Sequence, residues 1–152
     1  MSDSTAIERY LEDFTVGQTF RTRDRHITAD EIKRFAADFD PQPFHLDEAL
    51  AEGSIFKGLA ASGWHTAALT MKLLVESDFV PAGGMIGLGF EGRWPKPVRP
   101  GDTLHVESEV VNIRRSSSNP LRGVMTVHAA TLNQNGEAVQ LSTFNLIVPC
   151  RS

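Results

Sequence analysis

Asp40 and His45 are the two side chains whose types and spacing first suggest chemistry. They lie five positions apart in the segment DPQPFH, and a carboxylate and an imidazole can together move the protons of one water molecule. Prolines 41 and 43 disfavour helical geometry, so we predict a stiff, extended, non-helical link over residues 40–45. Five extended residues span roughly 15 Å, so the two side chains meet only if the chain bends after Pro43. The structural alternative is that Asp40 ends a helix and His45 is a core histidine.

Ser62 and Gly63 form a second candidate group, because a long helix is predicted to begin there. A helix N-terminus offers unpaired backbone N–H groups and the positive end of the helix dipole. Gly63 can present its N–H without a side chain in the way, whereas Ser62 is a typical helix-capping residue. The alternative for Gly63 is a plain loop glycine.

Other chemical arrangements are not indicated by the sequence. Glu107 and Glu109 lie two positions apart, but their alternation with apolar residues is typical of a solvated strand face. Cys150 is the single cysteine, which excludes an internal disulfide framework and a cysteine-based zinc site. Three histidines fall in predicted strands without metal-ligand spacing, so we predict no metal: His26, His105 and His128. Nucleophile elbows and phosphate-binding glycine loops are missing from the sequence.

The composition excludes several classes of partner. The 152 residues carry a formal net charge of −4, so the chain has no basic footprint for nucleic acid or an anionic membrane. The N-terminus does not read as a secretory signal, and no uncharged run reaches the roughly 18 residues needed to span a bilayer. We therefore expect a cytoplasmic protein with a single domain over residues 1–152, of which residues 1–10 are loosely ordered.

The elements that must position these residues begin with a strand over residues 17–27. Thr28 and Glu31 form a capping-box pattern, so a helix of about ten residues should follow and end before the first proline. A short helix is expected over residues 47–51. A long helix is predicted over residues 62–76, and its apolar residues cover so much of the circumference that we expect it to be buried on several sides.

The second half of the sequence supplies a sheet. Strands are predicted over residues 85–94, 104–110, 124–132 and 138–148, and Asn135-Gly136 is typical of a hairpin turn. One long apolar helix followed by a curved antiparallel sheet predicts an α+β domain in which the sheet wraps around the helix. The helix residues Trp64 and Met71 would then be core residues.

Three segments together resemble the MaoC-like dehydratase and (R)-specific enoyl-CoA hydratase family. DPQPFHLD, residues 40–47, resembles the hydratase signature, in which an Asp is followed by an Asn-Pro and by a His five positions after the Asp. Residues 58–74 look like the loop and start of the family's central helix, and residues 93–104 look like its strand–Pro-Val–Pro-Gly-Asp connection. The resemblance covers most of the chain from about residue 11 to residue 148. It implies the hotdog fold, a long central helix wrapped by a curved antiparallel sheet.

The resemblance implies reversible addition of water to a 2-enoyl thioester of CoA, in fatty acid metabolism. Asp40 would activate water, His45 would position it and share the proton transfers, and the Gly63 N–H would hold the thioester oxygen. Three residues would bind substrate: Ser62, Arg93 and Lys96. No cofactor is implied beyond CoA as part of the substrate. The family typically forms homodimers in which two sheets join edge to edge, which would also protect an exposed sheet edge.

The sequence departs from the family pattern at two positions. The Asn of the motif is Gln42 here, and the residue before the helix-starting glycine, often a His, is Ser62. A non-catalytic acyl-CoA-binding protein of the same fold is therefore an alternative. A thioesterase is less favoured, because that chemistry often uses an acidic residue on the central helix, which here offers only Glu76 near its end.

Overall fold

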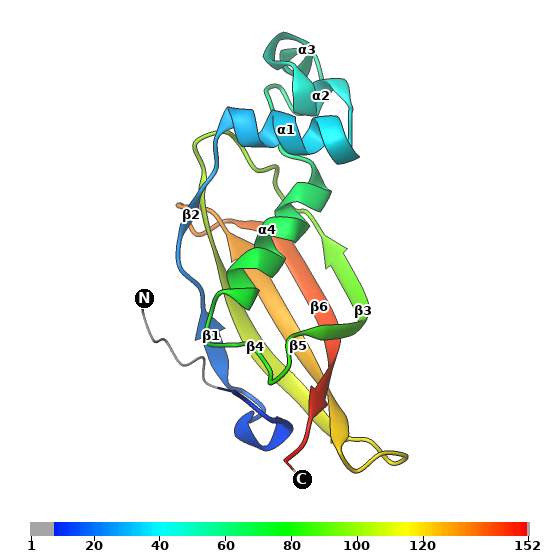
Figure 1. Ribbon diagram of the computed structural model, residues 1–152. Helices are drawn as coiled ribbons and strands as arrows, with labels where there is room; N and C mark the ends of the chain where they lie inside the picture. The colour runs from blue at the N-terminus through cyan, green and yellow to red at the C-terminus, as the bar shows by residue number, and fades with distance from the viewer. Residues whose placement is uncertain (1–7, 152) are drawn as a thin grey trace, which may run out of the picture.

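An antiparallel β-sheet forms the body of the molecule in the computed structural model, which describes residues 8–151 (Figure 1). The strand order is β1-β4-β5-β6-β3, and β2 pairs with a further part of β4. The strands are β1 (Thr19–Arg21), β2 (Arg25–His26), β3 (Ile86–Arg93), β4 (Thr103–Arg115), β5 (Arg122–Leu132) and β6 (Ala138–Pro149). A short 3-10 turn, Leu11–Asp13, precedes β1.

The first helix, α1 (Ala29–Phe39), begins where its sequence predicts. Glu31 N–H donates to Thr28 Oγ1 at 3.2 Å and Thr28 N–H donates to the Glu31 carboxylate at 3.5 Å, so both bonds of the capping box form. Ile32 and Ala36 are fully buried and fix the inner face of α1.

The extended link predicted over residues 40–45 is wrong in its second half. Gln42 is extended, with φ −104° and ψ 148°, but Pro43–Leu46 form one helical turn, α2. Proline is favoured at the first helical position, because its fixed φ suits a helix and its missing N–H would have no partner there. The His45 N–H donates to Gln42 O at 3.0 Å, which closes the turn. The chain therefore bends after Gln42.

The long helix, α4 (Gly63–Val75), lies across one face of the sheet, and α1, α2 and α3 (Glu48–Glu52) gather beyond its N-terminal end (Figure 1). The expectation that α4 is buried on several sides is wrong for the single chain. Leu73 is buried against the sheet, but Trp64 is 60% and Met71 48% exposed. One apolar side of α4 is left uncovered by its own chain.

Two clusters of buried side chains join the sheet to the helices. The first lies under the C-terminal half of α4 and includes Leu73, Leu74, Phe79, Val106, Val110, Met125, Val127, Phe144 and Leu146. The second lies toward its N-terminal half and includes Ile27, Ile32, Leu59, Leu69, Val98, Leu104 and Val139. The second cluster joins α1, α4 and the segment that leads into α4, so it sets the positions of the residues around the start of that helix.

The single strand predicted over residues 17–27 is two short strands. Thr22 lies between them and its N–H donates to Val106 O at 2.9 Å, as in a regular ladder. The Val106 N–H, however, donates to the Thr22 hydroxyl at 2.9 Å rather than to a backbone carbonyl. This side-chain bond interrupts the ladder and separates β1 from β2.

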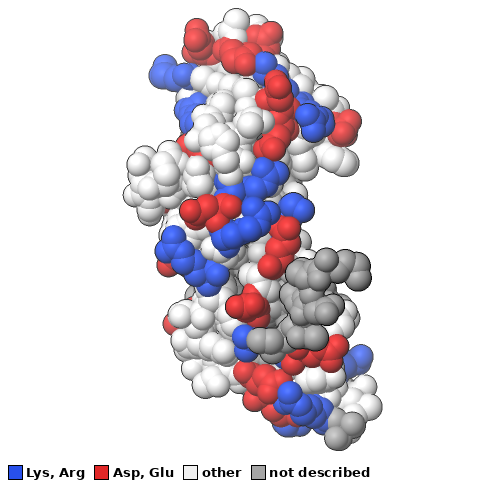
Figure 2. All heavy atoms as spheres, turned by 60° about the vertical axis from the view of Figure 1, so that its left-hand side comes forward, with Lys and Arg blue, Asp and Glu red and all other residues white. Residues whose placement is uncertain are grey.

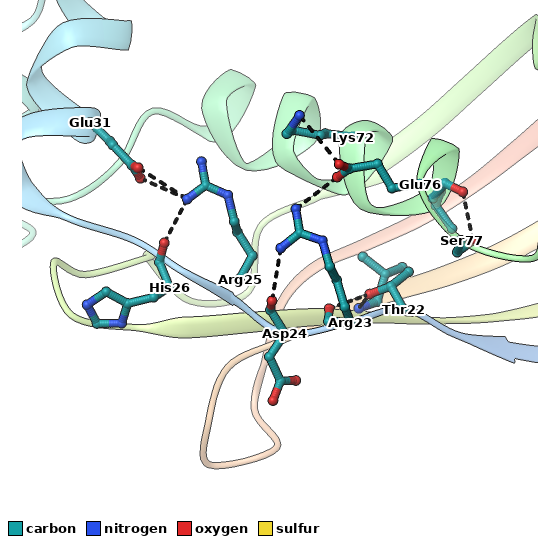
Figure 3. A network of polar contacts seen from close by, with 11 residues as sticks. Thr22, Arg23, Asp24, Arg25, His26, Glu31, Lys72, Glu76 and Ser77 are labelled. Atoms are coloured by element: carbon teal, nitrogen blue, oxygen red, sulfur yellow. Dashed lines mark hydrogen bonds and ion pairs between the residues drawn. The ribbon is translucent and has the colours of Figure 1, made fainter. Parts of the chain in front are cut away.

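The segment that contains β2 is tied to both α4 and α1 by ion pairs (Figure 3). Arg23 donates to Glu76 at 2.9 Å, and Glu76 also lies 3.7 Å from Lys72 of α4. Arg25 pairs with Glu31 at 3.1 Å, close to the start of α1. Acidic and basic side chains are likewise interspersed over the face shown in Figure 2.

The hairpin signal at Asn135-Gly136 is confirmed by the turn between β5 and β6. Gly136 has a φ of 73°, and the Asn133 N–H donates to Glu137 O at 2.9 Å. In β3, a register shift between Gly87 and Gly89 interrupts the pairing with β6. Within residues 8–151, no helix combines the length and the apolar character needed to cross a membrane.

Candidate active site

The bend at α2 brings Asp40 and His45 together, with His45 Nε2 3.3 Å from Asp40 Oδ2. His45 is buried, and its Nδ1 lies 2.6 Å from the carbonyl oxygen of Ala60. A carbonyl can only accept, so Nδ1 carries a proton, and in the neutral form of the ring Nε2 is the acceptor that faces Asp40. An imidazole lone pair and a carboxylate are both acceptors. One water molecule that lies beside both atoms can donate one O–H to each.

The Asp40 carboxylate receives a side-chain hydrogen bond on each oxygen. The Gln42 amide Nε2 donates to Oδ1 at 2.5 Å, and the Ser62 hydroxyl donates to Oδ2 at 2.7 Å. Burial by itself raises the pKa of Asp40, but these two hydrogen bonds, and the positive charge of His45 whenever its ring is protonated, outweigh it and bring the pKa below its ordinary value. Asp40 is therefore ionised at neutral pH and suited to accept a proton.

The first turn of α4 leaves one backbone donor open next to this pair. Ser62 is the N-cap, and its hydroxyl accepts from the Trp64 N–H at 3.2 Å. The carbonyl oxygen of Ser62 accepts from the N–H groups of His65 and Thr66. Among the described residues, the Gly63 N–H has no such acceptor, so it remains available at the positive end of the helix dipole.

Gly63 also meets a packing requirement that the sequence does not reveal. A Cβ built on Gly63 would lie 2.6 Å from two ring carbons of Trp94, which is closer than real Cβ atoms approach. The Trp94 indole is held in place because its Nε1 donates to Gln140 Oε1 at 2.9 Å. Glycine at this position thus allows the ring to lie against the start of α4.

Two phenylalanine rings cover the imidazole of His45. Phe44 lies edge-on to the ring with centroids 4.6 Å apart, and Phe56 lies 6.1 Å from it. The two phenylalanine rings are 5.0 Å from each other. These contacts keep water away from one side of His45 and provide an apolar wall beside the pair.

The structure brings together four of the six residues expected at the site, namely Asp40, His45, Ser62 and Gly63. Arg93 and Lys96 flank Trp94 and line a hollow of about 590 Å³ with it, and Lys96 pairs with Glu137. Neither cation contacts Asp40 or His45 in the described chain. Within residues 8–151, no cluster of three or more His, Cys, Asp and Glu side chains is arranged to hold a metal ion.

Arg99 is a supporting residue whose role the sequence does not reveal. Its guanidinium donates to the carbonyl oxygens of Gly58 at 2.9 Å and Leu59 at 3.3 Å, and also to that of Phe56. The next residue, Ala60, supplies the carbonyl that holds His45 Nδ1. Arg99 therefore fixes the segment that orients the imidazole. A basic residue between two prolines gave only a weak signal for this role.

Replacing Arg99 by Ala is expected to destabilise the fold by about 2–4 kcal/mol, because carbonyl groups in a partly buried loop lose charged donors. For a domain of this size, that corresponds to a decrease of roughly 5–10 °C in Tm. Thermal unfolding followed by circular dichroism measures the change. Arg93→Ala, at an exposed position, is the control. Equal stability of the two variants would contradict the assigned contacts.

The curated relatives and the solved structures point to one family. Residues 13–132 match the model of the MaoC like domain. The chain is 40% identical over 127 residues to the uncharacterised protein YdeM of Bacillus subtilis, covering 82% of this chain and 87% of that protein. It is 55% identical over 53 residues to a mesaconyl-CoA hydratase of Cereibacter sphaeroides, covering 34% of this chain but only 15% of that protein.

Two solved structures share the whole architecture. A MaoC-like dehydratase from Rhodospirillum rubrum has a TM-score of 0.92 and 53% identity, covering 95% of this chain and 99% of that one. The (R)-hydratase from A. caviae has a TM-score of 0.75 and 29% identity, covering 91% and 99%. The hotdog fold expected from the sequence, an α+β arrangement, is confirmed by these similarities. The chain belongs to the MaoC-like domain family.

Proposed function

We propose that the protein is a hydro-lyase that adds water to, or removes it from, a 2-enoyl or 3-hydroxyacyl thioester of CoA. The proposal rests on the close approach of His45 Nε2 to Asp40 Oδ2, which lie 3.3 Å apart next to the Gly63 N–H at the start of α4. Membership of the MaoC-like domain family supports it at the level of the reaction class. The names of a dehydratase and of two hydratases among the similar proteins agree with that class.

The proposed chemistry follows from the two acceptors of the pair. A water molecule donates one O–H to Asp40 and one to His45, and its oxygen faces C3 of the substrate. As the C3–O bond forms, Asp40 takes a proton from the water, and the electrons of the C2–C3 double bond move onto the thioester oxygen. When this enolate collapses, the pair returns a proton to C2. The net change is the addition of one water molecule across the double bond.

The proposed substrate contacts lie around the start of α4. The Gly63 N–H would donate to the thioester oxygen as it gains negative charge, and the dipole of a 13-residue helix favours that charge. Ser62, expected from the sequence to bind substrate, would act through Asp40, whose carboxylate its hydroxyl holds. Arg93 and Lys96 would bind phosphate groups of CoA, which is part of the substrate and not a cofactor.

Hydrolysis of the thioester by an acid on the central helix is not favoured by the geometry. Glu76 follows the last residue of α4, about 20 Å along the helix from Ser62. Its carboxylate is occupied by Arg23 and Lys72. Within one chain, the acidic group and the N-terminal donor therefore cannot meet on one substrate carbonyl.

A panel of enoyl-CoA substrates tests the proposed function. Crotonyl-CoA, a branched enoyl-CoA and the dicarboxylic mesaconyl-CoA should be followed by loss of the enoyl thioester absorbance. We expect the protein to hydrate at least one of these three substrates. Tight binding of acyl-CoA without hydration of any member would favour the non-catalytic binding protein instead.

A homodimer is part of the proposal, because one apolar face is left open. This open face consists of Trp64, Met71 and Val75 on α4 with Ile86, Leu88 and Phe90 on β3, all between 48% and 60% exposed. The Trp64 ring touches that of Trp94, just after β3, which makes the face continuous. β3 is also an unpaired edge of the sheet. An edge strand with exposed apolar side chains is the kind of surface that a second copy of the chain covers.

Replacing Met71 by Glu is expected to convert the dimer to monomers, because the charge would be buried in the interface without a partner. Sedimentation velocity gives the masses, with Leu121→Glu as a control at an apolar residue of similar exposure in the β4–β5 turn. We expect a dimer for the parent and the control. A monomeric parent, or a variant that stays dimeric, would contradict this part of the proposal.

A further inference from the structure

The carboxylate of Asp40 is held by two side chains that come from different parts of the chain. Gln42 lies two residues after Asp40 and donates to Oδ1, and Ser62 lies at the start of α4 and donates to Oδ2. These are also the two positions at which the sequence departs from the family motif. The longer amide of Gln42 reaches back to Asp40, and the short hydroxyl of Ser62 leaves its carboxylate room to approach the helix start.

The structure assigns to Gln42 and Ser62 a joint role as positioning residues, a clamp that keeps the Asp40 carboxylate charged and in one rotation beside His45. This inference rests on the proposed function for the part that Asp40 plays in turnover. The clamp acts through Asp40 alone, so neither donor needs to touch the substrate.

The position of Asp40 explains why such a clamp is needed. Asp40 is the C-cap of α1, where the negative end of the helix dipole opposes a negative charge. Its side chain is only 17% exposed, so burial also raises its pKa. His45 is the titratable group that faces it. The hydrogen bonds from Ser62 and Gln42, with a further contribution from His45 when it is protonated, outweigh the effect of burial and keep the pKa below its ordinary value.

The clamp also sets the geometry of the pair. A carboxylate with one donor on each oxygen cannot rotate freely about the bond between Cβ and Cγ. Oδ2 is then fixed 3.3 Å from His45 Nε2, with its second lone pair free for water. The backbone helps, because the Gln42 N–H donates to the Asp40 carbonyl oxygen at 2.8 Å and fixes the path of the chain between the two side chains.

The test compares Gln42→Ala, Ser62→Ala and Gln42→Glu with the parent protein. The pKa of the Asp40 carboxyl is read from the pH titration of its carbon-13 signal by NMR, which does not depend on turnover. In each alanine variant we expect the pKa of Asp40 to rise and kcat/KM to fall by about 10-fold or more. The acid limb of the pH profile should move to higher pH. Gln42→Glu should raise the pKa further, because it places a second carboxylate beside the first.

Thr28→Ala is the matched control, because it removes a helix N-cap that does not contact Asp40. It should lower thermal stability and leave the pKa of Asp40 unchanged. Alanine variants that lose stability but keep the parent pKa of Asp40 would overturn the clamp. A raised pKa in a protein that hydrates no thioester would uphold the clamp and count against the proposed function only. An unchanged pKa of Asp40 in alanine variants of an enzyme that does hydrate a thioester would overturn the clamp and leave the proposed function standing.

Discussion

Replacing Asp40 by Asn is expected to lower kcat by about 100- to 10,000-fold while the chain still folds, because the amide cannot take a proton from water. Asn has nearly the same shape, and its amide oxygen can still accept from Ser62. The fall in kcat should therefore reflect the missing proton transfer and not a change in the fold. Hydration of the best substrate of the panel gives kcat and KM, and circular dichroism gives Tm.

Asp38→Asn is the matched control for this variant, because Asp38 lies on the same helix and is exposed. It should retain the parent rate. The pH dependence provides a second check of the same residue. The ionised form of Asp40 is the active one, so activity should be present above its pKa and lost as the pH falls through it. Because that pKa is lowered, activity should be lost only below the pH range in which an ordinary aspartate titrates. An Asp40→Asn enzyme with the parent kcat would show that another group moves the proton.

Replacing His45 by Gln is expected to lower kcat by about 100- to 10,000-fold as well, with a smaller effect on KM. Glutamine can still donate to the carbonyl of Ala60, but it does not exchange a proton with water at neutral pH. The double variant with Asp40→Asn should be no slower than the slower single variant, because two residues that act on one water molecule act as a unit.

His128→Gln is the control for this substitution, because His128 is an exposed residue of β5. Its kcat should equal that of the parent. If the effects of Asp40→Asn and His45→Gln were instead fully additive, the two residues would act on separate steps. The shared water molecule would then be the wrong description of the site.

The sequence predicted the start of α1 and the approximate place of the pair, but not how the pair forms. The capping residues Thr28 and Glu31 lie three positions apart, so the hydrogen bonds between them do not depend on the tertiary fold. The sequence shows that Asp40 and His45 can meet only if the chain bends, but it does not predict the bend, because two closely spaced prolines favour an extended chain. Pro43 instead occupies the first position of a helical turn, where proline is favoured.

The exposure of α4 could not be read from its sequence. Apolar periodicity shows that Trp64 and Met71 avoid water, but it does not say whether their own chain or another one covers them. The contacts of Asp40 were also outside the reach of the sequence. The residue types at 42 and 62 were visible as departures from a motif, whereas their meeting on one carboxylate depends on the packing of α1 against α4.

The most direct test of the proposed reaction follows the isotopes of water into the product. The enzyme is incubated with its best enoyl-CoA in water enriched in oxygen-18, and separately in deuterium oxide, and the products are analysed by mass spectrometry. The account predicts an intact thioester with one oxygen-18 in the hydroxyl group at C3 and one deuterium at C2. Oxygen-18 in a free carboxylic acid together with released CoA would instead identify a thioesterase and contradict the account.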